Sequence, residues 1–317
     1  MSAARPLALG LALAGAADAA GWSSALELAS WADAHGLDSL WLPESHLRAG
    51  ATASPLVGLA AFAARTRRIR LGTTSLLISI HEPRRVAAEV AALDWISRGR
   101  VVLGLGRGFD PGLFRAFGVD PRDKRNRFDD ALDAMLETWA GGPGPQQRPH
   151  PPLYVAAFGA KGLAQAARRG LPYLASPLEG LGALAENFAL HSAQLPREID
   201  PAALPVAVMR TVHVAADGAE ARRVRDAAEA EFAALAARPG GPLASRAGGA
   251  ASDRVLVGEL AEVAEALARY RERLGLDLLV ARPGPRTEPH ERRASLERLA
   301  ELVTTQFGVI PRNRLRG

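Results

Sequence analysis

The stretch VVLGLGRGFDPGLFRAFGVDPRDKRNR, residues 101–127, determines how the rest of the chain is interpreted. Residues 101–105 form a short apolar run that is typical of a buried strand. The run ends in Gly106-Arg107-Gly108, where two glycines let a backbone approach a ligand closely. Arg107 at the end of this strand and Arg125 at the start of the next helix could hold a phosphate between them. The alternative is a tight turn with two solvated arginines, because arginine is abundant in this chain and usually exposed.

The bulk composition is that of a globular protein, and it excludes several classes of function. The chain has 317 residues, of which 48% are hydrophobic and 23% charged, so it can form one large α/β barrel or two ordinary domains. Its net charge is +5, but the arginines are mixed with acids along the whole chain, so we expect no nucleic-acid binding. The absence of cysteine excludes disulfides, cysteine nucleophiles and thiolate metal sites, and it fits a cytoplasmic location.

The beginning of the sequence allows two interpretations. Arg5 followed by an alanine- and leucine-rich run resembles a signal peptide with a small-residue cleavage site. The same residues also fit a first buried strand over 7–14, which we favour because the later pattern needs a strand here. No apolar run reaches the roughly 18 residues of a membrane span, so we expect no membrane association.

Strands and helices are predicted to alternate along the rest of the chain. The expected strands are 7–14, 39–43, 69–80, 101–105, 153–158, 173–176, 206–214 and 276–281. The expected helices are 22–35, 54–66, 83–96, 128–139, 159–169, 181–192, 219–237, 259–274 and 295–307, with loops rich in glycine and proline at 140–152 and 238–253, the second a mobile one. Eight βα units without a linker favour one domain over residues 1–317, a single TIM (β/α)8 barrel with short insertions, over a doubly wound open sheet.

In such a barrel the active site lies at the carboxyl ends of the strands. Candidate groups follow several of the predicted strands: Glu44 and His46 the second, Arg107 the fourth and Gly159 the fifth, while Thr73, Thr74 and Ser75 lie in the third. We interpret His81 and His213 as structural or exposed. The other histidines lack a ligand spacing such as two histidines four residues apart, so we expect no metal site. The sequence contains no nucleophile-elbow motif, so it does not indicate a hydrolase.

Several stretches, taken in order, resemble the bacterial luciferase-like monooxygenases, which are flavin- or deazaflavin-dependent TIM barrels. They include GLDSLWLPESH (36–46), HEPRRVAAEVAALDWISRGRVVLGLGRGF (81–109) and PPLYVAAFGAKGLAQAARRGLPYLAS (151–176). The resemblance implies a monooxygenase that uses reduced FMN from a separate flavin reductase, O2 and a small organic substrate. It also implies a homodimer, to which residues 65–68 and 86–95 could contribute. A coenzyme F420-dependent oxidoreductase and a non-catalytic flavin-binding barrel remain as alternatives.

The resemblance also implies roles for single residues. Arg107 and Arg125 match the arginines that hold the flavin phosphate in luciferase-type proteins. The loop after the fifth strand lacks the hydroxyl groups found in luciferase, so the backbone N–H groups at Gly159 and Gly162, with Lys161, are left to contact the phosphate. Ser176 is a further candidate for the cofactor pocket. Thr73, Thr74 and Ser75 match a strand with a bulge or a non-prolyl cis peptide, which we predict at the Thr74–Ser75 bond.

One departure from the family pattern concerns catalysis. Many relatives have Glu-His-His after the second strand, and the first of these histidines assists catalysis in luciferase. This chain has Glu44-Ser45-His46, so Ser45 replaces that histidine. His46 could donate a proton or bind substrate, or it could be a structural residue. Glu44 could act beside it, or it could pair with an arginine such as Arg107.

Overall fold

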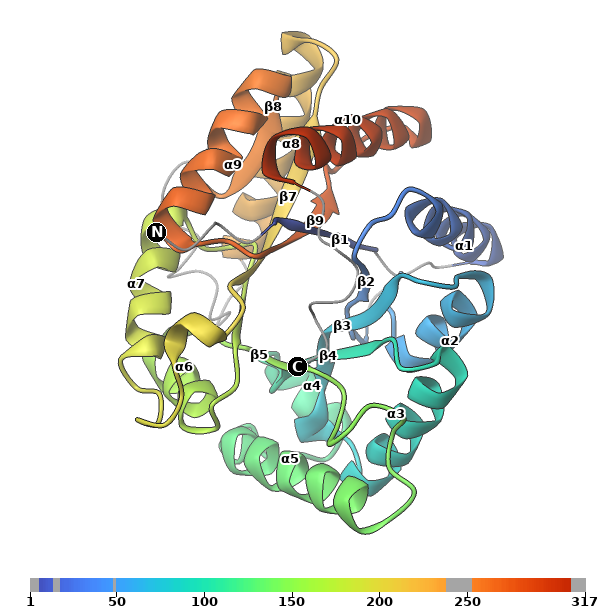
Figure 1. Ribbon diagram of the computed structural model, residues 1–317, viewed down its shortest axis with the longest axis vertical. Coiled ribbons are helices and arrows are strands. Elements are labelled where there is room, and N and C mark those ends of the chain that lie inside the picture. Colours follow the sequence, from blue (N-terminus) through green and yellow to red (C-terminus); the bar gives the residue numbers. More distant parts are fainter. Residues whose placement is uncertain (1–5, 14–17, 48–49, 238–252, 309–317) are drawn as a thin grey trace. The chain divides into compact units, whose positions relative to one another are not determined.

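The computed structural model describes residues 6–13, 18–47, 50–237 and 253–308 (Figure 1). The chain divides into two compact units, which are described separately. The N-terminal unit is Ala12–Ala156, and the C-terminal unit is Ala157–Gly317 together with Met1–Leu11.

The N-terminal unit alternates parallel strands with helices. Its elements are α1 (Ala19–Ala34), β2 (Ser39–Leu42), α2 (Pro55–Arg65), β3 (Arg70–Leu77), the 3-10 helix η1 (Ile78–Ile80), α3 (Pro83–Ser97), β4 (Val101–Gly106), α4 (Pro111–Ala116), α5 (Lys124–Gly141) and β5 (Leu153–Ala156). Strands β2, β3, β4 and β5 pair in this order, all in parallel. Figure 1 shows α2, α3 and α5 on the outer side of these strands. Strands covered in this way read as nearly continuous apolar runs, as 101–105 does.

Close packing in this sheet explains one of its glycines. Trp41 on β2 is fully buried, and its ring meets Tyr154 edge-on at 6.1 Å between centroids. A Cβ atom on Gly72 of β3 would lie 2.6 Å from the Trp41 ring. The absence of a side chain at Gly72 therefore makes room for the largest residue of the neighbouring strand.

The C-terminal unit repeats the alternation. Its elements are β1 (Ala8–Ala12), α6 (Gly159–Arg168), β6 (Tyr173–Ala175), α7 (Leu181–Ser192), the 3-10 helix η2 (Pro201–Ala203), β7 (Ala207–Val214), α8 (Gly218–Ala236), β8 (Val255–Gly258), α9 (Leu260–Leu274), β9 (Leu278–Pro283) and α10 (Pro289–Phe307). Strand β9 pairs in parallel with β1 and with β7. Strand β7 also pairs with β6 at its start and with β8 at its end. Strand β9 pairs along most of one edge of β7. The other edge of β7 is therefore shared by β6 and β8.

This alternation of parallel strands and helices confirms the predicted α/β class, the TIM barrel. The N-terminal strand is also confirmed, as β1. Four elements were missed: the helix α4, the 3-10 helices η1 and η2, and β8, a four-residue apolar run that comes after the loop 238–253. The predicted strand 69–80 ends at Leu77, and the last helix begins at Pro289, where Glu288 and Glu291 form a capping box. Of the loop 238–253, all but Asp253 lies outside the described residues, and the single-domain organisation stays a prediction.

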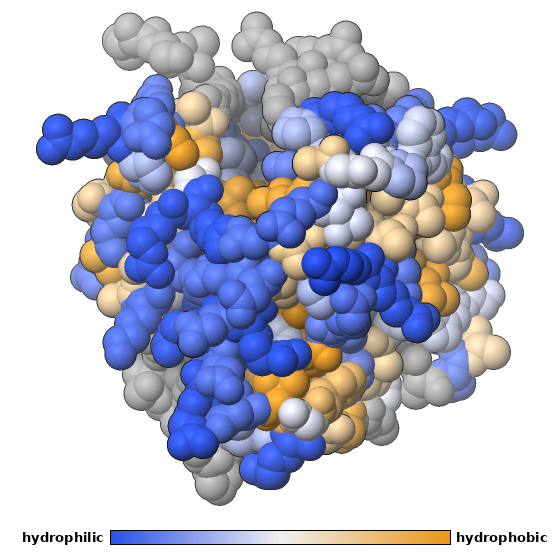
Figure 2. Space-filling model, turned by 90° about the horizontal axis from the view of Figure 1, so that it is seen from below, coloured by the Kyte–Doolittle hydropathy of each residue, from blue (hydrophilic) through white to orange (hydrophobic). Residues whose placement is uncertain are grey.

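The outer face of α5 is strongly charged. Arg125, Asp130, Asp133 and Glu137 are all exposed on this helix. Figure 2, which views the molecule from below, shows a face covered mainly by hydrophilic side chains, with separate hydrophobic areas between them. None of the helices in the described part of the chain has the length and hydropathy that a bilayer crossing requires.

Candidate functional site

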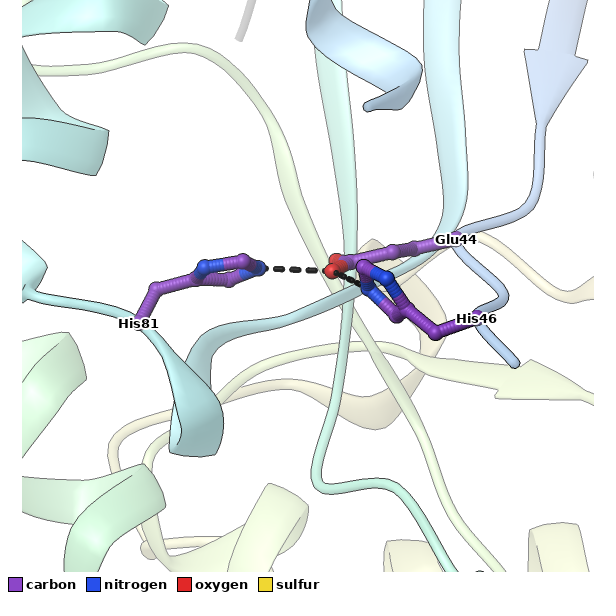
Figure 3. Close-up of side chains that lie close together, drawn as sticks. All are labelled: Glu44, His46 and His81. Atoms are coloured by element: carbon purple, nitrogen blue, oxygen red, sulfur yellow. Dashed lines mark hydrogen bonds and ion pairs between the residues drawn. The ribbon is translucent and has the colours of Figure 1, made fainter. Parts of the chain in front are cut away.

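Glu44 is the centre of a group of ionisable side chains in the N-terminal unit (Figure 3). It follows β2, and its side chain is fully buried. Its Oε1 lies 2.7 Å from Nε2 of His46 and 2.6 Å from Nε2 of His81. Its Oε2 accepts a hydrogen bond of 2.7 Å from the Leu77 N–H. We refer to Glu44, His46 and His81 as the Glu44 cluster.

The environment of Glu44 favours the ionised carboxylate. Burial alone favours the neutral acid, but hydrogen bonds and charge from His81, with hydrogen bonds from the Leu77 N–H and His46, more than offset it. The pKa of Glu44 therefore lies below its ordinary value of 4.5. Since an ionised carboxylate only accepts hydrogen bonds, both imidazoles direct a protonated Nε2 at Oε1.

The loops around the Glu44 cluster are fixed by short-range contacts. Ser45 donates its backbone N–H to the Thr52 carbonyl, and its hydroxyl accepts a hydrogen bond from the Thr52 N–H. Phe117, which follows α4, meets the ring of His46 at 4.9 Å and the ring of His81 at 6.3 Å between centroids, both edge-on. Ser45 therefore contributes to the conformation of this loop.

The structure changes the interpretation of two of these residues. Glu44 was expected to act beside His46 or to pair with an arginine, and the structure pairs it with two histidines. His81, interpreted from the sequence as structural or exposed, belongs to the same cluster and has a side chain that is 27% exposed. This contact could not be predicted from local spacing, because His81 lies 35 positions after His46 in the sequence. The only signal in the sequence was that β2 and β3 are consecutive parallel strands, whose carboxyl ends lie side by side.

A second group in the same unit consists of cations. Arg107 follows β4, while Lys124 and Arg125 are the first residues of α5. Burial and the positive charge of Arg125 lower the pKa of Arg107 to about 10, although Asp129 opposes the shift. Burial, Arg125 and Arg107 likewise lower the pKa of Lys124. We refer to Arg107, Lys124 and Arg125 as the Arg107 cluster.

The Arg107 cluster has the charge and position that an anion requires. Arg107 is protonated at neutral pH, because its pKa of about 10 lies well above neutral. The N-terminus of α5 adds the positive end of a helix dipole. The structure thus brings together the two arginines that the sequence suggested as phosphate ligands, and it adds Lys124, which sequence analysis did not select. Their role in binding phosphate stays a prediction.

Strand β3 changes course at the expected residues. The Thr74–Ser75 peptide bond is cis, as predicted, and the register between β3 and β4 shifts between Thr74 and Leu76. Thr73 is buried and donates its hydroxyl to the Gly104 carbonyl at 2.9 Å. A Cβ atom on Gly106 would collide with Oγ of Ser75. Gly106, which directly precedes Arg107, is therefore required by the position of Ser75.

The remaining candidates lie in the C-terminal unit. Gly159, at the start of α6, has a φ of +66°, which favours glycine, while Lys161 is exposed and Gly162 buried. Ser176 follows β6, and its hydroxyl accepts a hydrogen bond of 3.2 Å from the Leu178 N–H.

A residue that was not predicted from the sequence, Arg210, fixes the turn after β6. Arg210 is fully buried on β7, and its guanidinium donates to the carbonyls of Ser176 and Glu179, each at 2.6 Å. It also donates to the Tyr270 hydroxyl at 2.7 Å. The available signal was a single arginine inside the otherwise apolar run VAVMRTVHV.

Comparisons with known proteins agree on one family. A family model described as luciferase-like monooxygenase matches residues 8–278. The chain is 40% identical over 117 residues to 4-hydroxyprotoasukamycin monooxygenase of Streptomyces nodosus subsp. asukaensis, covering 37% of this chain and 32% of that protein. It is 29% identical over 151 residues to the oxygenase component of the flavin-dependent trigonelline monooxygenase of Acinetobacter baylyi, covering 42% of each. The match thus spans less than half the length of either relative.

A solved structure supports the same assignment over nearly the whole chain. Monooxygenase RslO1 from Streptomyces bottropensis superimposes with a TM-score of 0.78 at 26% identity, covering 93% of this chain and 98% of that one. Because the family model spans most of the sequence, the chain belongs to the luciferase-like monooxygenase family.

Proposed function

We propose that this chain is the oxygenase component of a two-component monooxygenase that uses reduced FMN. A separate flavin reductase would supply the reduced cofactor. One atom of O2 would enter a small organic substrate and the other would leave as water, with two electrons from the flavin. The name of the trigonelline relative, which describes a flavin-dependent oxygenase component, supports this proposal.

The Arg107 cluster is the observation that carries the choice of FMN. FMN differs from riboflavin by a phosphate group, which is dianionic near neutral pH. Burial and the neighbouring cations lower the pKa of Arg107 and of Lys124, so an anion bound among them would offset both effects. Arginine is well suited to bind a phosphate through paired hydrogen bonds. The residues present therefore fit a flavin phosphate.

Other residues of the chain have proposed roles in holding and using the cofactor. When bound, reduced FMN supplies the electrons that activate O2. Thr73, Thr74 and Ser75 support the flavin ring, and Glu44 keeps a proton on Nε2 of His46 for transfer to the reacting groups. In the C-terminal unit, the N–H groups of Gly159 and Gly162, with Lys161 and Ser176, remain candidate cofactor ligands.

The phosphate assignment can be tested by comparing FMN with riboflavin. We expect the wild-type protein to bind FMN more tightly than riboflavin, measured by fluorescence titration. In Arg107→Ala, FMN affinity should fall by about 10- to 100-fold, because a charge-assisted hydrogen bond contributes roughly 1.5–3 kcal/mol. Riboflavin affinity should hardly change.

The matched control is Arg122→Ala. Arg122 precedes the same helix, but its side chain is 88% exposed and pairs with Asp120. This variant should retain the preference for FMN. If Arg107→Ala keeps the full preference, the phosphate assignment is wrong.

Activity separates the proposal from its alternatives. With FMN, NADH, a flavin reductase and O2, we expect oxygen-dependent loss of substrate across a panel of small organic compounds. Binding of F420 without binding of reduced FMN would instead indicate a deazaflavin-dependent oxidoreductase. Tight flavin binding without turnover would indicate a non-catalytic barrel.

A cytoplasmic location is part of the proposal, since the reduced flavin has to pass from the reductase to this chain.

A homodimer is also proposed, with α2 and α3 at the interface. These neighbouring helices expose Val57, Trp95 and Ile96 at 70%, 56% and 60% of their surfaces. Light scattering should give twice the mass of the chain for the wild-type protein, and Ile96→Glu should weaken the association. A wild-type protein that is monomeric at all concentrations would contradict it.

A further inference from the structure

We propose that the Glu44 cluster is a binding site for a divalent transition-metal ion, with Zn²⁺ as the probe. Its three donors come from separate segments: Glu44 directly after β2, His46 in the following loop, and His81 after η1. Oε1 of Glu44 and one ring nitrogen of each histidine all lie within 4.8 Å of one another. Figure 3 shows both imidazole rings directed at the carboxylate.

The donor set selects the class of metal. Two imidazole nitrogens and one carboxylate oxygen suit Zn²⁺, Fe²⁺, Ni²⁺ or Cu²⁺, whereas Mg²⁺ and Ca²⁺ prefer oxygen ligands alone. The chain has no cysteine, so no thiolate competes for a soft ion. Three protein ligands leave one position of a tetrahedral ion open to water.

Backbone groups hold the Glu44 carboxylate and its main chain in place. The Leu77 N–H binds Oε2 of Glu44, so Oε1 remains directed at the histidines. The Glu44 N–H donates to the Ser75 carbonyl at 3.3 Å, which fixes the backbone of the residue. The Phe117 ring packs edge-on beside both imidazole rings, at 4.9 and 6.3 Å between centroids.

Only a small movement separates the observed geometry from a metal site. The two Nε2 atoms lie 2.7 and 2.6 Å from Oε1, which are hydrogen-bond distances. Ligands about 2.0–2.1 Å from a tetrahedral ion lie roughly 3.3 Å apart, so each imidazole would withdraw by about 0.6 Å. The side chains of His46 and His81 are 11% and 27% exposed, so an ion can reach them from solvent. Each histidine would then carry its remaining proton on Nδ1, so a bound ion takes the place of the Nε2 proton that His46 would offer to the reacting groups in the metal-free protein.

The test is Zn²⁺ binding to the cofactor-free full-length chain, measured by calorimetry after treatment with a chelator. We expect one Zn²⁺ per chain, with an affinity that falls at least about ten-fold in each of Glu44→Gln, His46→Gln and His81→Gln. His290→Gln is the matched control, because His290 is exposed on α10 and lies next to Glu291. This variant should bind Zn²⁺ as the wild type does, while Mg²⁺ should not bind the cluster.

A spectroscopic measurement distinguishes this site from adventitious surface binding. Co²⁺ added in place of Zn²⁺ should give the visible absorption of a four-coordinate ion, and the three cluster variants should lose it. Circular dichroism confirms that each variant is folded. Absence of Zn²⁺ binding, or equal affinity in the wild type and the cluster variants, would overturn the proposal. Neither readout requires flavin binding or turnover, so failure here leaves the proposed monooxygenase activity untouched.

Discussion

The Glu44 cluster and the Arg107 cluster lie in the same unit of the chain, but their balance of charge is opposite. In the first, one buried carboxylate accepts hydrogen bonds from two imidazoles and a backbone N–H, and the pKa of Glu44 is lowered. In the second, cations lie near one another, and the pKa values of Arg107 and Lys124 are lowered. The first cluster therefore stabilises the fold in the absence of a ligand, whereas the second is stabilised further when an anion binds.

The largest expected effect is the loss of the Glu44 carboxylate. Glu44→Ala would leave the Leu77 N–H and the two imidazoles without their buried acceptor, and we expect the free energy of unfolding to fall by about 3–5 kcal/mol. Urea denaturation of the cofactor-free protein measures this change. Glu89→Ala is the control, because Glu89 forms a surface pair with Arg85 and should contribute at most about 0.5 kcal/mol. Equal losses in the two variants would show that the Glu44 cluster does not stabilise the fold.

The second prediction concerns the pH dependence of FMN binding. Arg107 is charged below its pKa of about 10 and loses its charge as the pH rises through that value. The affinity for FMN relative to riboflavin should therefore be constant from about pH 7.5 to 9 and decline above about pH 10. Riboflavin has the same ring system, so titration of the ring cancels in this ratio. A ratio that stays constant up to about pH 11 in folded protein would mean that Arg107 does not contact the phosphate.

A smaller effect is expected where the two clusters are connected. Ser75 accepts the Glu44 N–H through its carbonyl and packs against Gly106, the residue before Arg107. In Gly106→Ala the new methyl group would displace Ser75, which we expect to destabilise the protein by about 1–3 kcal/mol and to weaken FMN binding.

Gly141→Ala is the matched control for this substitution, because no atom lies within 4 Å of a Cβ at that position. It should leave the free energy of unfolding the same or slightly higher. Thermal unfolding and FMN titration of both variants give the comparison. Loss of stability in Gly106→Ala with unchanged FMN affinity would show that the two clusters are independent of each other.

Sequence patterns predicted most of the fold because each buried strand and amphipathic helix has its own periodicity. Strand β8 was missed because its four residues stand next to the glycine- and proline-rich loop 238–253, whose composition is typical of irregular structure; β2 and β5 are as short but were predicted. The helix α4 was missed because its six residues lie between glycines and prolines that are typical of a loop. Elements of this length depend on tertiary contacts for their stability, and a single sequence does not reveal those contacts.

The candidate site was predictable only in part, for a related reason. Glu44, Arg107 and the cis Thr74–Ser75 bond were accessible because their positions are local to strand ends that match the family pattern. The position of His81 depends on the pairing of β2 with β3 and on the turn of η1. Neither can be recognised from the residues that flank His81 in the sequence. Lys124 was overlooked because a lysine before Arg125 is ordinary at a helix start, and its effect on Arg107 arises through space.

The smallest expected effect tests the claim that like charges in the Arg107 cluster destabilise the cofactor-free protein. Lys124→Met removes one cation and keeps an unbranched side chain near the Phe114 ring, which lies 5.9 Å from the ammonium group. Because solvent screens this partly exposed charge, we expect the free energy of unfolding to rise by only about 0.5 kcal/mol. FMN affinity should fall, since the phosphate loses a cation. Lys161→Met is the control: Lys161, the other lysine of the chain, is exposed, so its replacement should not change the free energy of unfolding. If Lys124→Met instead destabilised the cofactor-free protein, the contrast between the two clusters would fail, because Lys124 would then stabilise the fold as Glu44 does.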